Sequence, residues 1–184
     1  MDNVIIINDK VIELKGSNID YEVLAEGLFK YIPNIAKECR RIDKAIEAKA
    51  YNSYKNTTNV EKQIYAMLEL KAKKQFLLTV QDTFARWYKY LPEDRKDLFV
   101  RHYVKRLKIN EKRKEYYRLA KMQSSFADFI KRKDAFDVEE LLEDEVIKNE
   151  YVRAYKLKLR RDNDIKNKEL QAYSGKETYE VCEA

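Results

Sequence analysis

The scarcity of glycine and proline constrains the fold of this 184-residue chain most, since it contains only 3 Gly and 2 Pro. Tight turns between strands depend on these residues, so an all-β fold is disfavoured. Hydrophobic residues make up 45% of the chain and charged residues 38%, which suits a thin helical core. We therefore predict an all-α fold, a multi-helix bundle with one long central helix.

The N-terminus, residues 1–17, is predicted to add a short β-hairpin to this bundle. Two β-prone runs within residues 4–14 flank Asn8 and Asp9, a pair that favours a turn. A lone hairpin is marginally stable in water, so it should pack on a helix or pair with another chain. A frayed terminus is the alternative.

Residues 18–90 are predicted to form a helical scaffold. Asn18 or Asp20 can cap a helix that ends near Tyr31, and Pro33 can then begin another. From Leu28, six apolar residues stand at alternating intervals of four and three, interrupted by Pro33, which is more typical of an intramolecular seam than of a coiled-coil dimer. They are Leu28, Ile32, Ile35, Cys39, Ile42 and Ile46. The cysteine in this seam is expected to be a buried hydrophobe rather than a reactive thiol.

A long helix is predicted over residues 59–90, after a polar loop at residues 50–59. Thr58 and Glu61 match a capping box at its start. At ~1.5 Å per residue the helix is a rod of roughly 45 Å. Its expected apolar stripe is Ile64, Met67, Leu68, Ala72, Phe76, Val80, Phe84, Trp87 and Tyr88.

The whole chain has a net charge of +6, and in its second half the charges are distributed in blocks. Residues 101–136 carry 12 basic and 4 acidic side chains, and residues 137–150 carry 1 and 7. Such blocks indicate segments with different roles. The acidic block can fold against the basic helices, repel DNA or meet a basic protein surface. Residues 149–184 are predicted to be a basic helical extension with a disordered tail from residue 173, in which Cys182 is an unpaired thiol.

Residues 91–148 are predicted to form a helix-turn-helix module of three short helices. Pro92 stands in a typical helix start, and Asn110 can cap a second helix. After a polar break at residues 123–125, Ser124 or Ser125 can cap a third helix with a core anchor at Phe129. A break of three or four residues before the last helix is what this motif requires. The remaining apolar residues expected on the third helix are Phe126, Ile130 and Phe136.

The text of this module, "LPEDRKDLFVRHY" followed by "SSFADFIKRKDAF", resembles the phage late-gene transcription regulators of the RinA/ArpU type. Upstream, "YIPNIAKECRRIDKAI" and "TTNVEKQIYAML" are similar to the early helix of that family and the start of its long helix, so the resemblance covers roughly residues 25–140. It implies a sigma-region-4-like helix-turn-helix with Ser124 as the cap of the recognition helix. The expected partners are duplex DNA and RNA polymerase.

The predicted DNA-binding surface follows from that third helix entering the major groove. Asp128 departs from the pattern, because a carboxylate repels phosphate, although it could accept a hydrogen bond from a cytosine amino group. Candidates for base contacts are Ser125, Ala127, Asp128 and Lys131, and for phosphate contacts Lys112, Arg113, Lys114, Arg118, Lys121, Arg132 and Lys133. A solubilising helix face is the alternative for each of them.

Other chemistry is sparse in the sequence, which has a single histidine, His102, and two distant cysteines. No phosphate-binding loop or nucleophile motif occurs, so we expect neither an enzyme nor a metal or cofactor site. No apolar run approaches the ~18 residues of a membrane span, and we expect a cytoplasmic location. A protein-binding helical adaptor and a non-specific RNA-binding protein are the alternative functions. A homodimer would use the seam over residues 28–46 or the N-terminal hairpin.

Overall fold

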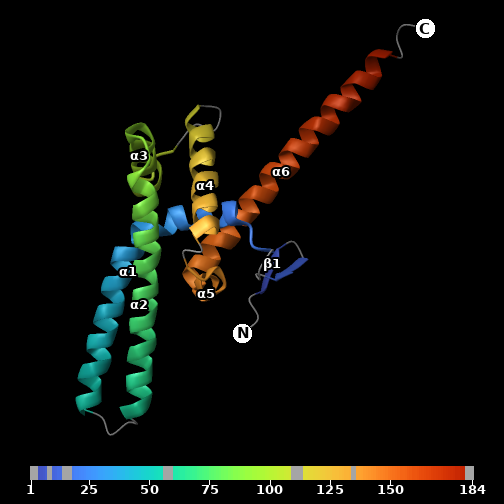
Figure 1. Cartoon of the computed structure of the whole chain (residues 1–184). Helices are drawn as coiled ribbons and strands as arrows, with labels where there is room; N and C mark the ends of the chain where they lie inside the picture. The colour runs from blue at the N-terminus through green and yellow to red at the C-terminus, as the bar shows by residue number, and fades with distance from the viewer. Residues whose placement is uncertain are drawn as a thin grey trace.

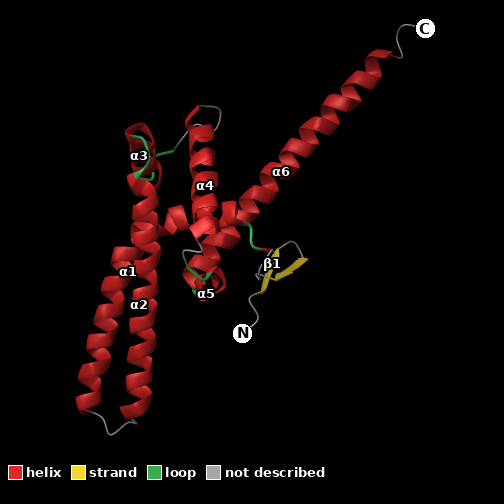
Figure 2. Cartoon of the chain, in the orientation of Figure 1, coloured by secondary structure: helices red, strands yellow, loops and turns green. Residues whose placement is uncertain are grey.

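The computed structural model describes residues 4–7, 10–13, 18–55, 60–108, 114–133 and 136–180, with side chains for 18–51, 60–108, 114–133 and 136–167. The predicted all-α body is confirmed (Figures 1 and 2). Its helices are α1 (Tyr21–Lys55), α2 (Val60–Lys89), α3 (Glu93–Phe99), the π-helix η2 (Val100–Val104), α4 (Lys114–Lys133), α5 (Val138–Glu143) and α6 (Glu145–Glu180). Two short strands, β1 (Val4–Ile7) and β2 (Lys10–Glu13), pair antiparallel, and the turn predicted between them lies outside the described residues.

Asp20 caps the start of helix α1, because its Oδ1 accepts hydrogen bonds from the backbone N–H groups of Glu22 and Val23 at 3.1 and 3.2 Å. It then continues through Pro33, so the predicted start of a second helix there is wrong. Proline inside a helix removes a hydrogen bond and bends the axis, and Figure 1 shows α1 changing direction between its blue and teal parts. The Asn34 side-chain amide donates to the carbonyl of Lys30 at 3.3 Å beside this bend.

The predicted polar loop at residues 50–59 is also wrong in part, because α1 continues to Lys55. Helix α2 confirms the long helix predicted from the apolar stripe. The capping box proposed for its start involves Thr58, which lies outside the described residues. Near the start of α2, Ile64 and Leu68 are 46% and 54% exposed, so the first part of the predicted stripe is not buried.

The seam of α1 is intramolecular, as the spacing predicts. Five of its six residues are buried, including Cys39, and Ile46 is half-buried. They belong to the same core as Leu77, Val80 and Phe84 of α2, which runs beside α1 in Figure 1. Since this surface is used within the chain, it does not offer a face for a homodimer.

One aromatic residue, Phe29, lies at the centre of the core. Its ring centroid is 5.3 to 6.0 Å from five other aromatic rings, those of Phe84, Trp87, Phe99, Tyr103 and Phe126. These rings come from α2, α3, η2 and α4, so residues 18–90 and 91–148 share one core. The boundary expected between residues 148 and 149 falls inside α6.

Helix α6 crosses α1 at close range and then projects away from the other helices (Figure 1). A Cβ atom added to Gly27 would lie 3.2 Å from the backbone nitrogen of Tyr151, so a glycine permits this crossing. The Tyr151 hydroxyl accepts a hydrogen bond from the backbone N–H of Asp20 at 3.1 Å. The helix extends to Glu180 and so includes most of the tail that we predicted to be disordered, and Cys182 lies outside the described residues.

Alkaline pH is expected to destabilise this crossing. Burial raises the pKa of Tyr151 to about 12, against ~10 for an unfolded tyrosine. Because the folded pKa is the higher one, the contribution is complete below pH ~10 and is lost as the pH rises through ~12. Two pKa units correspond to about 3 kcal/mol. Urea unfolding between pH 9 and pH 12 should therefore show a smaller loss of stability in Tyr151→Phe than in the wild type, and equal losses would contradict this assignment.

Candidate nucleic-acid interface

The helical segment after α2 begins as the sequence predicts. Pro92 stands immediately before α3, where its missing N–H group has no consequence for helix hydrogen bonding. The π-helix η2 follows directly and ends at Val104, and Arg106 just beyond it has a positive φ of 55°. Asn110, the expected cap of the next helix, lies outside the described residues.

The predicted break at residues 123–125 is absent, because α4 is continuous from Lys114 to Lys133. Neither Ser124 nor Ser125 caps a helix, and the second and third predicted helices are one. The polar residues of the supposed break are held in the helix by distant partners. The Gln123 side-chain amide donates to the Tyr103 hydroxyl at 2.9 Å, and the Trp87 indole N–H donates to the Ser125 hydroxyl at 3.3 Å.

The change in stability caused by one substitution distinguishes a continuous α4 from a helix broken at residues 123–125. In a helix interior alanine is more favourable than serine by up to ~0.5 kcal/mol, so Ser124→Ala should leave stability unchanged or raise it slightly. A serine that caps a helix would instead lose roughly 1 kcal/mol in the same substitution. Urea denaturation of the full chain measures the difference, and a clear loss of stability would restore the predicted break.

The inner face of α4 fixes its orientation on the core. Phe126 is fully buried, stacked on Phe29 at 5.3 Å between centroids and 4.9 Å from the Trp87 ring. Phe129, which we expected to be the core anchor, is only half-buried. The anchor is therefore Phe126, supported by the buried side chains of Leu119, Met122 and Ile130 at helical spacing.

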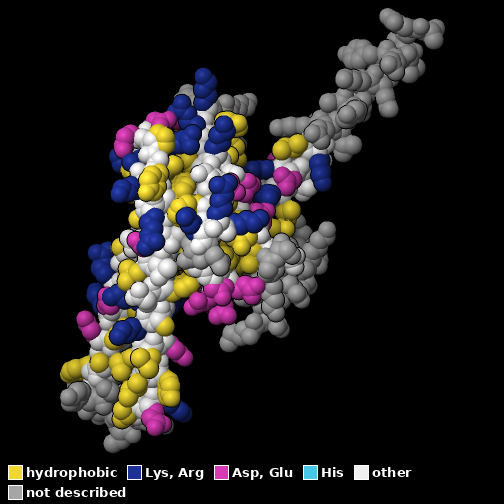
Figure 3. Space-filling view, in the orientation of Figure 1, with side chains coloured by type: hydrophobic (Ala, Val, Ile, Leu, Met, Phe, Trp, Pro, Cys, Tyr) yellow, Lys and Arg dark blue, Asp and Glu magenta, His cyan; other side chains and the backbone are white. Residues whose placement is uncertain are grey.

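The opposite face of α4 carries the basic stripe, which we define as the exposed residues Lys114, Arg118, Lys121, Ser125, Asp128 and Arg132. Their intervals of four and three place them in one row, about 27 Å long at ~1.5 Å per residue. Figure 3 shows several Lys and Arg side chains over the part of the molecule where α4 lies. The row presents four cations, a hydroxyl and one carboxylate to solvent.

Most cations of α4 have no carboxylate partner within the described part of the chain. Arg118 approaches Asp94 at 3.4 Å, but both side chains are about half exposed, and such pairs contribute little. The ammonium of Lys121 lies 4.8 Å from the ring centroid of Tyr117, and that of Lys131 lies 5.9 Å from that of Tyr21. These contacts leave the positive charges open to an anionic ligand.

The structure divides the predicted base-contact residues. Ala127 is buried, so it cannot contact bases as we expected, whereas Ser125 is exposed and its hydroxyl can still donate while it accepts from the Trp87 indole N–H. Asp128 and Lys131 are exposed. The phosphate-contact candidates Lys114, Arg118, Lys121, Arg132 and Lys133 are exposed on this one helix, whereas Lys112 and Arg113 lie outside the described residues.

Three exposed cations between η2 and α4 were not predicted as site residues from the sequence. They are Lys105, Arg106 and Lys108. The positive charge of residues 101–136 was the signal that could have included them.

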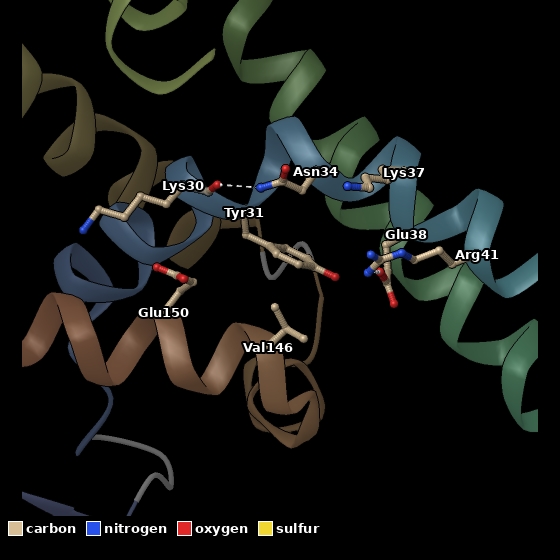
Figure 4. A pocket seen from close by; sticks show the side chains of 8 residues that line it. All are labelled: Lys30, Tyr31, Asn34, Lys37, Glu38, Arg41, Val146 and Glu150. Atoms are coloured by element: carbon tan, nitrogen blue, oxygen red, sulfur yellow. Dashed lines mark hydrogen bonds and ion pairs between the residues drawn. The ribbon is translucent and has the colours of Figure 1, made fainter. Parts of the chain in front are cut away.

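A small cavity of about 210 Å³ between α1 and α6 is a weaker candidate site (Figure 4). The buried Tyr31 points between the two helices there, and burial raises the pKa of its hydroxyl well above the ordinary value, so the hydroxyl stays protonated. Lys30 is paired with Glu26, and Arg41 with Glu38, so much of the charge around this cavity is already neutralised. No group of three or more potential metal ligands occurs among the described residues.

The chain matches no protein-family model, no curated protein and no solved structure. Across the described helices, none carries an apolar stretch long enough to cross a bilayer. The basic stripe is therefore the feature of this structure on which a function can be argued.

Proposed function

We propose that this chain is a non-enzymatic DNA-binding transcription regulator that contacts duplex DNA through the outward face of α4. The observation that carries the proposal is the row of exposed cations, of which Arg118 alone approaches a carboxylate, that of Asp94, within the described structure. Phosphate contacts of this kind supply most of the affinity of proteins for DNA. The resemblance to phage late-gene regulators adds RNA polymerase as a second proposed partner.

The geometry of α4 suits this role. Its apolar side is fixed in the core, so the stripe is presented by a rigid element rather than by a loop. A major groove about 12 Å wide admits one helix, with flanking cations reaching the phosphates on either side. Asp128 lies in the same row as these cations, and its carboxylate favours a cytosine amino group.

Duplex DNA binding that weakens steeply with salt is the expected result. Up to six phosphates can be neutralised by Lys114, Arg118, Lys121, Lys131, Arg132 and Lys133, which gives a slope of log affinity against log salt near −5. Fluorescence anisotropy of a labelled duplex, titrated at several salt concentrations, measures this slope. Absence of binding at low salt, or a slope near zero, would overturn the proposal. Stronger competition by structured RNA than by unlabelled duplex DNA would favour the RNA-binding alternative.

A further inference from the structure

A second surface of the molecule has the opposite charge. An open groove of about 550 Å³ lies between α2, α5 and the start of α6. Its floor is apolar, formed by Ala72, Phe76, Leu77 and Val146. Its rim is acidic, formed by Glu69, Glu140, Glu143, Asp144 and Glu145, and Figure 3 shows Asp and Glu side chains gathered near α5.

The acidic rim is largely uncompensated. Asp144 is paired with Lys73 at 2.7 Å, and this lysine is the single cation in the lining of the groove. The other four carboxylates form no ion pair with any residue in the described ranges. A ligand that brings positive charge to this rim therefore gains attraction that the chain itself does not supply.

The apolar floor continues along α2 beyond the groove. Leu68 and Tyr65 are 54% and 68% exposed, and they precede Ala72 and Phe76 at intervals of three or four residues. The row from Tyr65 to Phe76 is about 17 Å long, or roughly three helical turns. An exposed apolar row of this length beside a charged rim is typical of a surface that receives a partner helix.

We propose that this groove, with the row on α2, binds a basic amphipathic helix of another protein. The apolar side of that helix lies on Leu68, Ala72 and Phe76, and its Lys or Arg side chains meet Glu69, Glu140 and Glu143. Nucleic acid is repelled by the same carboxylates. The most basic helix of a second copy, α4, is not available for this role, because its apolar side lies in its own core.

The inference does not rest on DNA binding and is tested separately from it. The probe is a labelled amphipathic peptide of leucine and lysine, about 14 residues long to span the row. The full chain should bind this peptide and bind a leucine–glutamate peptide at least about tenfold more weakly.

Three variants locate the binding. The neutralised rim, Glu69→Gln with Glu140→Gln and Glu143→Gln, should weaken binding about tenfold or more, and Ala72→Gln should do so without any change in charge. The matched control Glu47→Gln with Asp162→Asn and Asp164→Asn removes the same charge at exposed positions elsewhere and should change affinity less than about twofold. Circular dichroism checks that each variant keeps its helices.

The opposite results would overturn the inference. Absence of binding would show that the groove does not receive such a helix. Equal weakening by the matched control, or an inert Ala72→Gln, would show that the attraction is general electrostatics. Analytical sedimentation of the chain without peptide measures whether it self-associates. Self-association that the rim variant abolishes would show that a second copy occupies the groove in place of the proposed partner.

Discussion

Replacing Phe29 with alanine is expected to lower the free energy of unfolding by about 3–5 kcal/mol. Its ring is fully buried and contacts five aromatic rings from four other elements, so the deletion leaves a cavity that no single helix can close. Urea denaturation followed by circular dichroism measures the loss. Tyr65→Ala, at a position 68% exposed on α2, is the control and should change stability by less than about 0.5 kcal/mol.

The same experiment ranks the two phenylalanines of α4. Phe126→Ala should cost clearly more than Phe129→Ala, because Phe126 is fully buried and Phe129 is not. The reverse order would mean that α4 is rotated about its axis relative to the structure, and the basic stripe would then face another direction.

The combined substitution of Arg118, Lys121 and Arg132 with alanine should weaken duplex DNA binding by two to three orders of magnitude at 0.1 M salt. Each lost phosphate contact makes the salt slope shallower by ~0.9. At 0.1 M salt, one decade below 1 M, each lost contact therefore lowers log affinity by a similar ~0.9. The slope should accordingly fall by about half, from near −5 to roughly −2.5. Anisotropy titrations of the same duplex measure both quantities.

The matched control for this variant is the alanine substitution of Lys44, Lys49 and Lys71, which are exposed on α1 and α2. It removes the same net charge far along the chain from α4 and should change affinity less than about threefold. Equal losses in the two variants would show that net charge, rather than the outward face of α4, determines binding.

Sequence patterns predicted those features of the fold that depend on long apolar repeats. The seam around Ile35 and the stripe through Val80 and Phe84 repeat over many turns, so both helices could be expected. Local signals failed where tertiary contacts outweigh them. Pro33 was taken as a helix start, yet the packing of α1 on both sides of it keeps one bent helix.

The candidate site was predicted in its charge and not in its geometry. Its cations could be located from the sequence, since residues 101–136 are strongly basic. The face they share could not, because the polar run at residues 123–125 resembled a turn. In the structure this run packs beside the buried Met122 and Phe126 and bonds Tyr103 and Trp87, which lie 20 and 38 residues away in the chain. Such partners leave no local pattern.

Asp20 connects the start of α1 to α6, and this connection bears on the order in which the chain folds. This residue caps α1, its N–H group bonds Tyr151, and its carboxylate binds Lys158, at separations of 131 and 138 residues. Contacts between such distant residues close only after the entropy of a very long loop has been overcome. The cap of α1 on Glu22 and Val23 is local and can form early, whereas the bonds of Asp20 to Tyr151 and Lys158 form only once α6 packs against α1.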